Sequence, residues 1–226
     1  MQDIDTKNLE RISWDSYNQL LLYGEPGRLS KIFARYELYK KTIDLPGDIV
    51  EGGVFKGSGV LFWAKLIAIF NSSSARKVVG FDTFEGFLDQ NLDFETKFLK
   101  DNDDEVAAKS ATVEGLMKTA TAQGLQNRME LVAGDVVATI KKYTEDNPGF
   151  RVSLLNVDFD TYIPTKAVLE GLYDRVVPGG VVVLDEYAVS TWGESNAVDE
   201  FIADKGITMQ AFPWTHSPTA YFIKGS

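Results

Sequence analysis

Short apolar runs alternate along this chain with longer stretches in which apolar positions recur every three or four residues. The runs have the length and content of buried β-strands, and they lie at residues 49–50, 77–82, 129–132, 152–157 and 181–184. Helical periodicity fills the intervals, at residues 60–70, 106–122, 136–143 and 164–176. Strands that alternate with helices are typical of α/β folds. The pattern therefore predicts an α/β domain with a mostly parallel sheet flanked by helices.

A helical segment precedes the first strand. Its apolar positions recur at helical spacing over residues 5–45, and Gly24 and Pro26 divide it into two pieces. We therefore divide the chain into an N-terminal helical cap, residues 1–45, and a main domain, residues 46–226. Three roles for the cap stay open at this point: cover for a ligand site, a dimer face, and simple cover for the sheet.

A glycine-rich turn at residues 47–59 joins the first strand to the first helix of the main domain. Glycines let the backbone approach a ligand, and a helix N-terminus presents unpaired N–H groups. A P-loop needs a lysine before the serine, but Ser58 follows Gly57 directly, and the fingerprint G-x-G-x-x-G fails in every register. The acid Glu51 at the strand tip favours the looser loop of S-adenosylmethionine enzymes, with a structural turn as the alternative.

Acidic residues also follow the second and third strands. Asp82 ends the second strand about thirty residues after the glycine turn, where nucleotide-binding folds place an acid against the ribose hydroxyls. Asp135 follows Gly134 after the third strand, and it has two interpretations. It either caps the helix at residues 136–143 or borders an adenine ring.

Two neighbouring strands deliver further acids to one edge of the predicted sheet. Asp158 and Asp160 follow the strand at 152–157, and Asp185 and Glu186 follow the next strand. Ligands bind at the carboxyl edge of open parallel sheets, and clustered carboxylates repel one another unless a cation joins them. Oxygen ligands suit Mg²⁺ or Ca²⁺. We predict a hard divalent cation on Asp158, Asp185 and Glu186, with helix caps or solvated turn residues as the alternative for Asp160 and Glu186.

A long irregular stretch beside this predicted site, residues 84–105, interleaves aromatic and acidic residues. Such insertions next to ligand sites are more often lids than filler. We therefore predict a lid there. Trp192, which follows the last acidic strand end, is interpreted as core or lid packing in preference to a stacking surface for the acceptor.

Composition narrows the classes of partner. The 226 residues, 44% of them hydrophobic, suffice for one well-filled domain. A formal charge of -10 disfavours nucleic acid and anionic membranes, so a small molecule is the expected partner. With no cysteine there is no thiol nucleophile or thiolate metal site. The start of the chain lacks the features of a secretory signal, so a cytoplasmic protein is expected.

Five blocks of sequence form a recognisable set: LPGDIVEGGVFKGS at 45–58, GFDTFEGF at 80–87, VDFDTYIPT at 157–165, LYDRVVPGGVVVLDEY at 172–187 and AVDEF at 197–201. Together and in this order they resemble the macrocin O-methyltransferase (TylF/MycF) family. The resemblance implies a Rossmann-like class I methyltransferase fold with a seven-stranded sheet, S-adenosylmethionine as methyl donor, and dependence on Mg²⁺. It also implies a homodimer, and sugar hydroxyls on glycosylated natural products as acceptors.

Three departures from the family pattern lie near the expected acceptor and loop. The last acidic strand ends in Asp185-Glu186-Tyr187 where the family has Asp-Asp-Tyr, and residues 194–196 hold no arginine where one is common. Gly52 stands where the family often has cysteine. The acceptor side is thus less typical than the cofactor side, so the identity of the acceptor does not transfer.

The resemblance and the residue patterns together assign two sets of side chains. The residues assigned to the cofactor are Glu51, Gly52, Gly53, Val54, Phe55, Gly57, Ser58, Asp82, Thr83, Phe84, Gly134, Asp135 and Asp158. The residues assigned to catalysis are Asp158, Asp160 and Tyr162, and the single histidine, His216, is a further candidate base. Two other functions remain open: a nicotinamide-dependent oxidoreductase, and a binding module without catalysis on a similar sheet.

Overall fold

The computed structural model describes residues 8–88, 91–101 and 110–225. Its centre is a six-stranded sheet in the order β3-β2-β1-β4-β5-β6. The strands are β1 Asp48–Gly52, β2 Val78–Asp82, β3 Met129–Ala133, β4 Val152–Val157, β5 Val176–Leu184 and β6 Ala220–Ile223. The first five are parallel and β6 pairs antiparallel to β5. The predicted mostly parallel sheet is confirmed.

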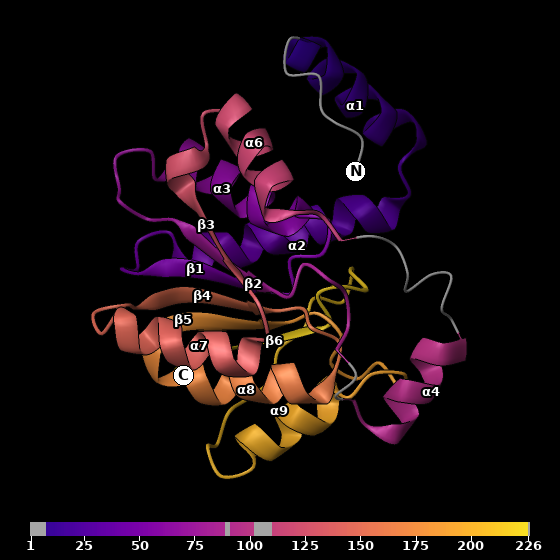
Figure 1. Ribbon diagram of the computed structural model, residues 1–226, viewed down its shortest axis with the longest axis vertical. Coiled ribbons are helices and arrows are strands. Elements are labelled where there is room, and N and C mark those ends of the chain that lie inside the picture. Colours follow the sequence, from indigo (N-terminus) through magenta and orange to yellow (C-terminus); the bar gives the residue numbers. More distant parts are fainter. Residues whose placement is uncertain (1–7, 89–90, 102–109, 226) are drawn as a thin grey trace.

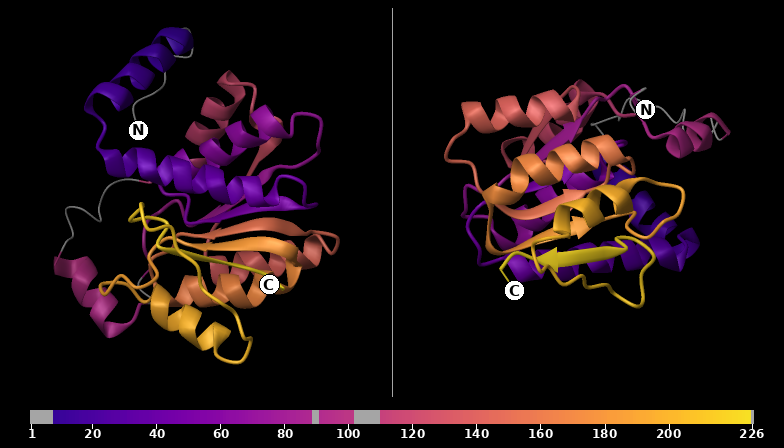
Figure 2. Two further views of the ribbon diagram at one scale, coloured as in Figure 1. Left: turned by 180° about the vertical axis from the view of Figure 1, so that it is seen from behind. Right: turned by 90° about the horizontal axis from the view of Figure 1, so that it is seen from below.

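Helices cover both faces of this sheet, as Figures 1 and 2 show. On one side lie α2 Pro26–Thr42, α3 Ser58–Phe70 and α6 Val113–Ala122, and on the other α7 Val136–Asp146, α8 Tyr162–Leu172 and α9 Glu194–Ile202. Alternate strand residues serve the two layers, because successive side chains point to opposite faces. Ile49 packs in the core beneath α2 and α3, whereas its neighbour Val50 packs in the core beneath α7 and α8.

The expectation of seven strands is not confirmed, because the described residues form six. Beside β6, an isolated antiparallel bridge joins Gln210 to Tyr221. Pro213 follows three residues later and has no N–H to donate, so it opposes a continued ladder. A second correction concerns the stretch before β5. The helix ends at Leu172 and a 3-10 turn covers Tyr173–Arg175, so the strand begins at Val176 rather than at residue 181.

The two N-terminal helices differ in how they meet the sheet. Helix α2 has Pro26 at its first turn, where a missing N–H costs nothing, and it buries Leu38 and Tyr39. Helix α1, Leu9–Tyr23, has no buried residue and extends away from the sheet in Figure 1. Only α2 therefore covers the sheet. Among the described helices, none combines the length and the apolar character of a transmembrane span.

The predicted lid segment is described at residues 84–88 and 91–101, and the rest of it lies outside the described residues. It contains helix α4, Asp93–Asp101, which lies beyond the carboxyl edge of the sheet (Figure 1). The helix expected at 106–122 begins at Val113, where Thr112 caps it by accepting from the Gly115 amide at 3.1 Å. Its first predicted positions, 106–109, lie outside the described residues.

Candidate functional site

A cavity of about 870 Å³ opens at the carboxyl edge of the sheet. The strand order reverses between β1 and β4, and in open α/β sheets that point forms a ligand crevice. The cavity is lined by many of the predicted site residues: Glu51, Gly53, Val54, Phe55, Ser58, Asp82, Thr83, Gly134, Asp135, Asp158, Asp160, Asp185 and Glu186. The glycine turn and the acids that follow four separate strands thus share one pocket.

Asp82 connects the tip of β2 to the glycine turn. Its Oδ2 accepts hydrogen bonds from the amides of Val54 at 2.7 Å and Phe55 at 2.9 Å. Its Oδ1 accepts from the Phe84 amide at 2.7 Å. The turn also needs glycine at 53, where φ is +83° and an added Cβ would lie 1.8 Å from the Asp158 carbonyl oxygen. These contacts hold the turn against the ends of β2 and β4.

Glu51 lies beneath this turn, almost fully buried. Its carboxylate accepts from the Trp63 indole N–H and from Asn156 Nδ2 at 3.2 Å, and Arg35 Nη2 lies 3.8 Å away. Burial raises the pKa of Glu51, and the Arg35 charge opposes that rise. An added Cβ at Gly59, the second residue of α3, would lie 1.7 Å from Glu51 Oε1, so glycine at this position makes room for the acid.

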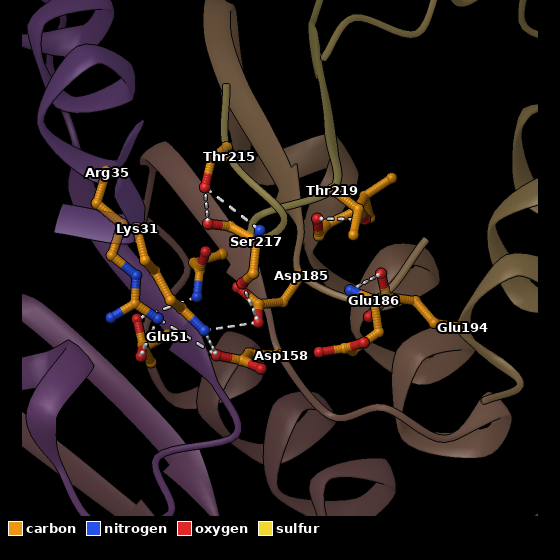
Figure 3. A network of polar contacts seen from close by, with 12 residues as sticks. Lys31, Arg35, Glu51, Asp158, Asp185, Glu186, Glu194, Thr215, Ser217 and Thr219 are labelled. Atoms are coloured by element: carbon orange, nitrogen blue, oxygen red, sulfur yellow. Dashed lines mark hydrogen bonds and ion pairs between the residues drawn. The ribbon is translucent and has the colours of Figure 1, made fainter. Parts of the chain in front are cut away.

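Two cations from α2 face the acids at the tips of β4 and β5 (Figure 3). Lys31 Nζ lies 2.7 Å from Asp185 Oδ2 and 3.9 Å from Asp158 Oδ2. Arg35 Nη2 lies 3.3 Å from Asp158 Oδ2. Ser217 Oγ donates to Asp185 at 2.8 Å. The cap helix therefore supplies the counter-charges of the acid cluster.

The pKa values of Asp158 and Asp185 shift in opposite directions because the cations lie at different distances from the two acids. Burial raises the pKa of Asp158 well above its ordinary value, and the Asp185 carboxylate raises it further. Burial acts the same way on Asp185, but Lys31 and Arg35 outweigh it and hold the pKa of Asp185 below its ordinary value. The opposite directions follow from the position of Lys31, which lies closer to Asp185 than to Asp158.

Asp160 and Glu186 complete the acidic wall of the cavity. Burial, with the carboxylates of Glu186 and Asp185, raises the pKa of Asp160 to about 8. Burial and Asp185 raise the pKa of Glu186 to about 7. Asp160 also has a left-handed backbone with φ of +63°, a conformation uncommon outside glycine, asparagine and aspartate. Added positive charge in the cavity would lower both pKa values.

The predicted catalytic role of Tyr162 stays a prediction, and the structure places its hydroxyl away from the cavity. Its hydroxyl donates to Glu200 at 2.7 Å and accepts from Lys166 at 3.0 Å, in contacts that lie outside the cavity lining. Tyr162 begins α8, and its hydroxyl contacts Lys166 of the same helix and Glu200 of α9. His216 is also outside the lining and is exposed beside Gly27. The structure thus does not bring either side chain together with the acids that line the cavity.

Three residues assigned to the cofactor also lie outside the cavity lining: Gly52, Gly57 and Phe84. Gly52 makes room for the Phe159 ring, which would lie 2.3 Å from an added Cβ. Gly57 has φ of +83° and precedes α3 as its cap. These two glycines shape the turn, and their place in the cofactor site stays a prediction. Asp135 does cap α7, accepting from the Val137 amide at 2.9 Å, and it also lines the cavity.

Sequence reasoning missed the cations. Lys31 and Arg35 stand four residues apart on a helix, so they share one face. The available signal was that both cations share a face with the buried Leu38. The local pattern did not show which acidic residues they would contact. In the described part of the chain, no group of three histidine, cysteine or acidic residues is arranged to hold a metal ion.

Comparison with known proteins places this geometry in a family. The family described as Macrocin-O-methyltransferase (TylF) matches residues 28–222. A relative from Streptomyces olivaceus, 8-demethyl-8-(2,3-dimethoxy-alpha-L-rhamnosyl)-tetracenomycin-C 4'-O-methyltransferase, is 28% identical over 73% of this chain. Mycinamicin III 3''-O-methyltransferase from Micromonospora griseorubida is likewise 28% identical over 73%. This chain covers only 61% and 63% of the lengths of these two relatives.

Solved structures show the same fold. A calicheamicin methyltransferase is 25% identical, with a TM-score of 0.79 over 98% of this chain and 91% of that one. An apo structure described as a TDP-rhamnose 3'-O-methyltransferase of calicheamicin biosynthesis is 26% identical, with a TM-score of 0.70 over 98% and 93%. The O-methyltransferase NovP, 22% identical with a TM-score of 0.72 over 88% and 80%, supports the fold alone. The Rossmann-like methyltransferase fold is therefore confirmed.

Proposed function

The chain belongs to the macrocin O-methyltransferase (TylF) family, and from this premise we propose that it transfers a methyl group from S-adenosylmethionine to a sugar hydroxyl of a small molecule. One observation carries the proposal: the glycine turn, Asp82 and the acids of β4 and β5 line a single cavity. The two relatives named above are O-methyltransferases, the name of one includes a rhamnosyl group, and one of the similar structures is described as a TDP-rhamnose 3'-O-methyltransferase. A sugar is thus the acceptor class that we assign to this chain.

We assign the donor to the side of the cavity formed by β1, β2 and β3. Asp82 Oδ2 already accepts two amides, but Oδ1 accepts only the Phe84 amide among the described backbone donors and would also accept from the ribose hydroxyls. Asp135 with Gly134 would border the adenine. The turn at 53–58 presents the N-terminus of α3. Glu51 acts on the donor only as part of the buried network with Arg35, because that network already engages its carboxylate.

Although no three of the described acids are already arranged around a metal position, the acids of β4 and β5 have the chemistry of ligands for a hard divalent cation. All three proposed ligands, Asp158, Asp185 and Glu186, offer oxygen. Asp185 Oδ1 is buried and has no hydrogen-bond partner in the described ranges, which leaves it open to a cation. Lys31 already brings one positive charge to this place. A divalent cation bound there would lower the pKa of the acceptor hydroxyl.

The protein must then orient the acceptor and remove one proton. The sulfonium donor is intrinsically reactive, so alignment of hydroxyl and methyl group accounts for much of the catalysis. Asp160 lines the cavity beside the cluster, and we assign it as the base. Its pKa of about 8 keeps it protonated in the free protein near pH 7, and positive charge brought by the ligands would ionise it for this role.

A panel of cofactors tests the proposal directly. Thermal shifts are measured with S-adenosylhomocysteine and with NADH, each with Mg²⁺ or with EDTA. We expect stabilisation by S-adenosylhomocysteine and none by NADH, followed by methyl transfer to nucleotide-linked or glycoside deoxysugars detected by mass spectrometry. Stabilisation by NADH alone would favour the oxidoreductase alternative, and binding of S-adenosylhomocysteine without transfer to any sugar would favour a binding module. Full activity after complete metal removal would contradict the cation site.

A further inference from the structure

Glu95, on the lid helix α4, is a charged side chain that is fully buried. Most of its helix is exposed or half-buried and lies away from the two hydrophobic cores. A carboxylate is rarely buried unless its oxygens are satisfied, because the loss of hydration is costly. The position of Glu95 therefore depends on what its oxygens contact.

Three backbone amides from three segments donate to this carboxylate. Oε1 accepts from the Tyr162 amide at 2.8 Å and from the Gly193 amide at 2.9 Å. Oε2 accepts from the Leu92 amide at 2.7 Å, within the lid itself. Gly193 must be glycine for this approach, since an added Cβ would lie 2.3 Å from Glu95 Oε1. One side chain thus joins the lid to two loops of the main domain.

Both amides outside the lid belong to helix N-termini. Tyr162 is the first residue of α8, and Gly193 is the cap residue of α9. The Thr161 side chain does not cap α8, and Gly193 has no side chain with which to cap α9. The Glu95 carboxylate therefore acts as a shared cap from a distant segment. A negative charge at the N-termini of two helices is also favourable for their dipoles.

These helices begin where the acidic loops end. Asp160 stands two residues before Tyr162, and its carbonyl oxygen accepts from the Glu194 amide at 3.1 Å. Beside this point the lid rings Phe87 and Phe98 flank Trp192, at centroid distances of 5.8 and 4.9 Å. All three rings line the cavity with Asp160. Glu95 therefore connects the aromatic wall of the cavity with the loop that carries the proposed base.

We propose that Glu95 is a positioning residue for the acceptor: it holds the aromatic wall of the lid and the Asp160 loop in one arrangement around the sugar. The inference rests on the proposed function for the identity of the acceptor, whereas the hydrogen bonds of Glu95 do not depend on that function. It touches neither donor nor base. Removing it should therefore impair use of the acceptor more than binding of the donor.

The kinetic test compares Glu95→Ala and Glu95→Gln with Asp101→Asn, which removes the same charge from an exposed position of α4. In Glu95→Ala we expect kcat/KM for a sugar acceptor found in the mass-spectrometric screen to fall at least about tenfold, the size expected when one or two helix caps are lost. The Kd of S-adenosylhomocysteine should stay within about twofold of the parent value. Glu95→Gln keeps an oxygen for the amides of Tyr162 and Gly193 and should recover most of the loss. An equal loss of donor affinity, or unchanged acceptor kinetics, overturns the proposal.

Amide hydrogen exchange provides a measurement that needs no acceptor. In Glu95→Ala, the amides of Tyr162 and Gly193 should exchange at least about tenfold faster than in the parent protein, whereas Asp101→Asn should leave both unchanged. Equal exchange in Glu95→Ala and the parent overturns the proposal. If the parent protein methylates no sugar but these amides respond, the proposed function fails and the shared cap remains.

Discussion

One lysine serves two carboxylates at the centre of the site. Lys31 lies 2.7 Å from Asp185 and 3.9 Å from Asp158, and its side chain is only 25% exposed. A pair shielded from water in this way is costly to break, because the remaining carboxylates lose their counter-charge. Lys31 therefore stabilises the free protein and occupies the place where a divalent cation would be attracted.

Replacing this lysine should expose both roles. In Lys31→Met, without divalent cation, we expect the free energy of unfolding to fall by about 1–3 kcal/mol, and Mg²⁺ should restore most of the loss. Denaturant unfolding with Mg²⁺ or EDTA measures this. Lys141→Met, an exposed lysine on α7, is the matched control and should change little. Equal stability of Lys31→Met and the control in EDTA would contradict the assignment.

We expect one acid of the cavity to act in binding of the methyl donor and two others to act in the reaction itself. Asp82→Ala is expected to weaken S-adenosylhomocysteine binding about 10- to 100-fold. The change removes the carboxylate that would accept from the ribose hydroxyls and that also accepts from the Val54 and Phe55 amides of the glycine turn. Asp158→Ala and Asp185→Ala should lower kcat by about 100-fold or more and leave that binding measurable. Calorimetry and initial rates separate the two effects. A similar loss of donor affinity in all three variants would show that the division is wrong.

Among the elements, the two N-terminal helices contribute unequally. Helix α2 brings Lys31 and Arg35 to the acids and buries part of its surface against the sheet, whereas α1 has no buried residue. The predicted cap is thus structurally divided: α2 belongs to the site, and α1 offers exposed apolar side chains such as Trp14 and Leu22. The homodimer that the resemblance implies stays a prediction.

Removing residues 1–24 tests the role of α1. Because helix α1 buries no side chain in the described structure, we expect Tm to change by less than about 3 °C and S-adenosylhomocysteine binding to persist. Scanning calorimetry measures the first and titration calorimetry the second. Sedimentation of both proteins reports the oligomeric state. A large fall in Tm, or a truncated chain that fails to bind the donor, would mean that α1 packs on this domain or on a second copy.

For the whole molecule, the acid cluster predicts how stability depends on pH. Asp160 and Glu186 have folded-state pKa values of about 8 and about 7, above those of an unfolded chain. The folded state therefore binds more protons between about pH 4 and pH 8, and this contribution to stability is lost as the pH rises through that window. It is fully present below about pH 4.

Thermal unfolding between pH 5 and pH 8 checks this sign. In EDTA we expect Tm to fall as the pH rises, with a smaller slope in Asp160→Asn because that side chain no longer titrates. Mg²⁺ should flatten the slope, since a cation stabilises the ionised acids. An Asp160→Asn protein with the parent slope would show that Asp160 does not titrate in this range. Glu186, which is partly exposed, should contribute less.

The amino-acid sequence by itself determined that the sheet is mostly parallel and at which edge the acidic residues lie. Apolar runs of strand length alternate with helical periodicity, and parallel strands place their carboxyl ends together. Asp82, Asp158 and Asp185 could therefore be assigned to one cavity from their positions after strands. The glycine turn was recognisable for a similar local reason, since a sharp turn before a helix requires glycine.

Only the tertiary structure decided which side chains meet. Lys31 and Asp185 are 154 positions apart, and no local period relates a helix face to a distant strand tip. The same holds for Glu95, whose partners at Tyr162 and Gly193 lie 67 and 98 positions away. Likewise, the sequence did not show that the Tyr162 hydroxyl contacts Lys166 and Glu200. Periodicity predicts elements and their faces, whereas contacts between elements depend on how those faces pack.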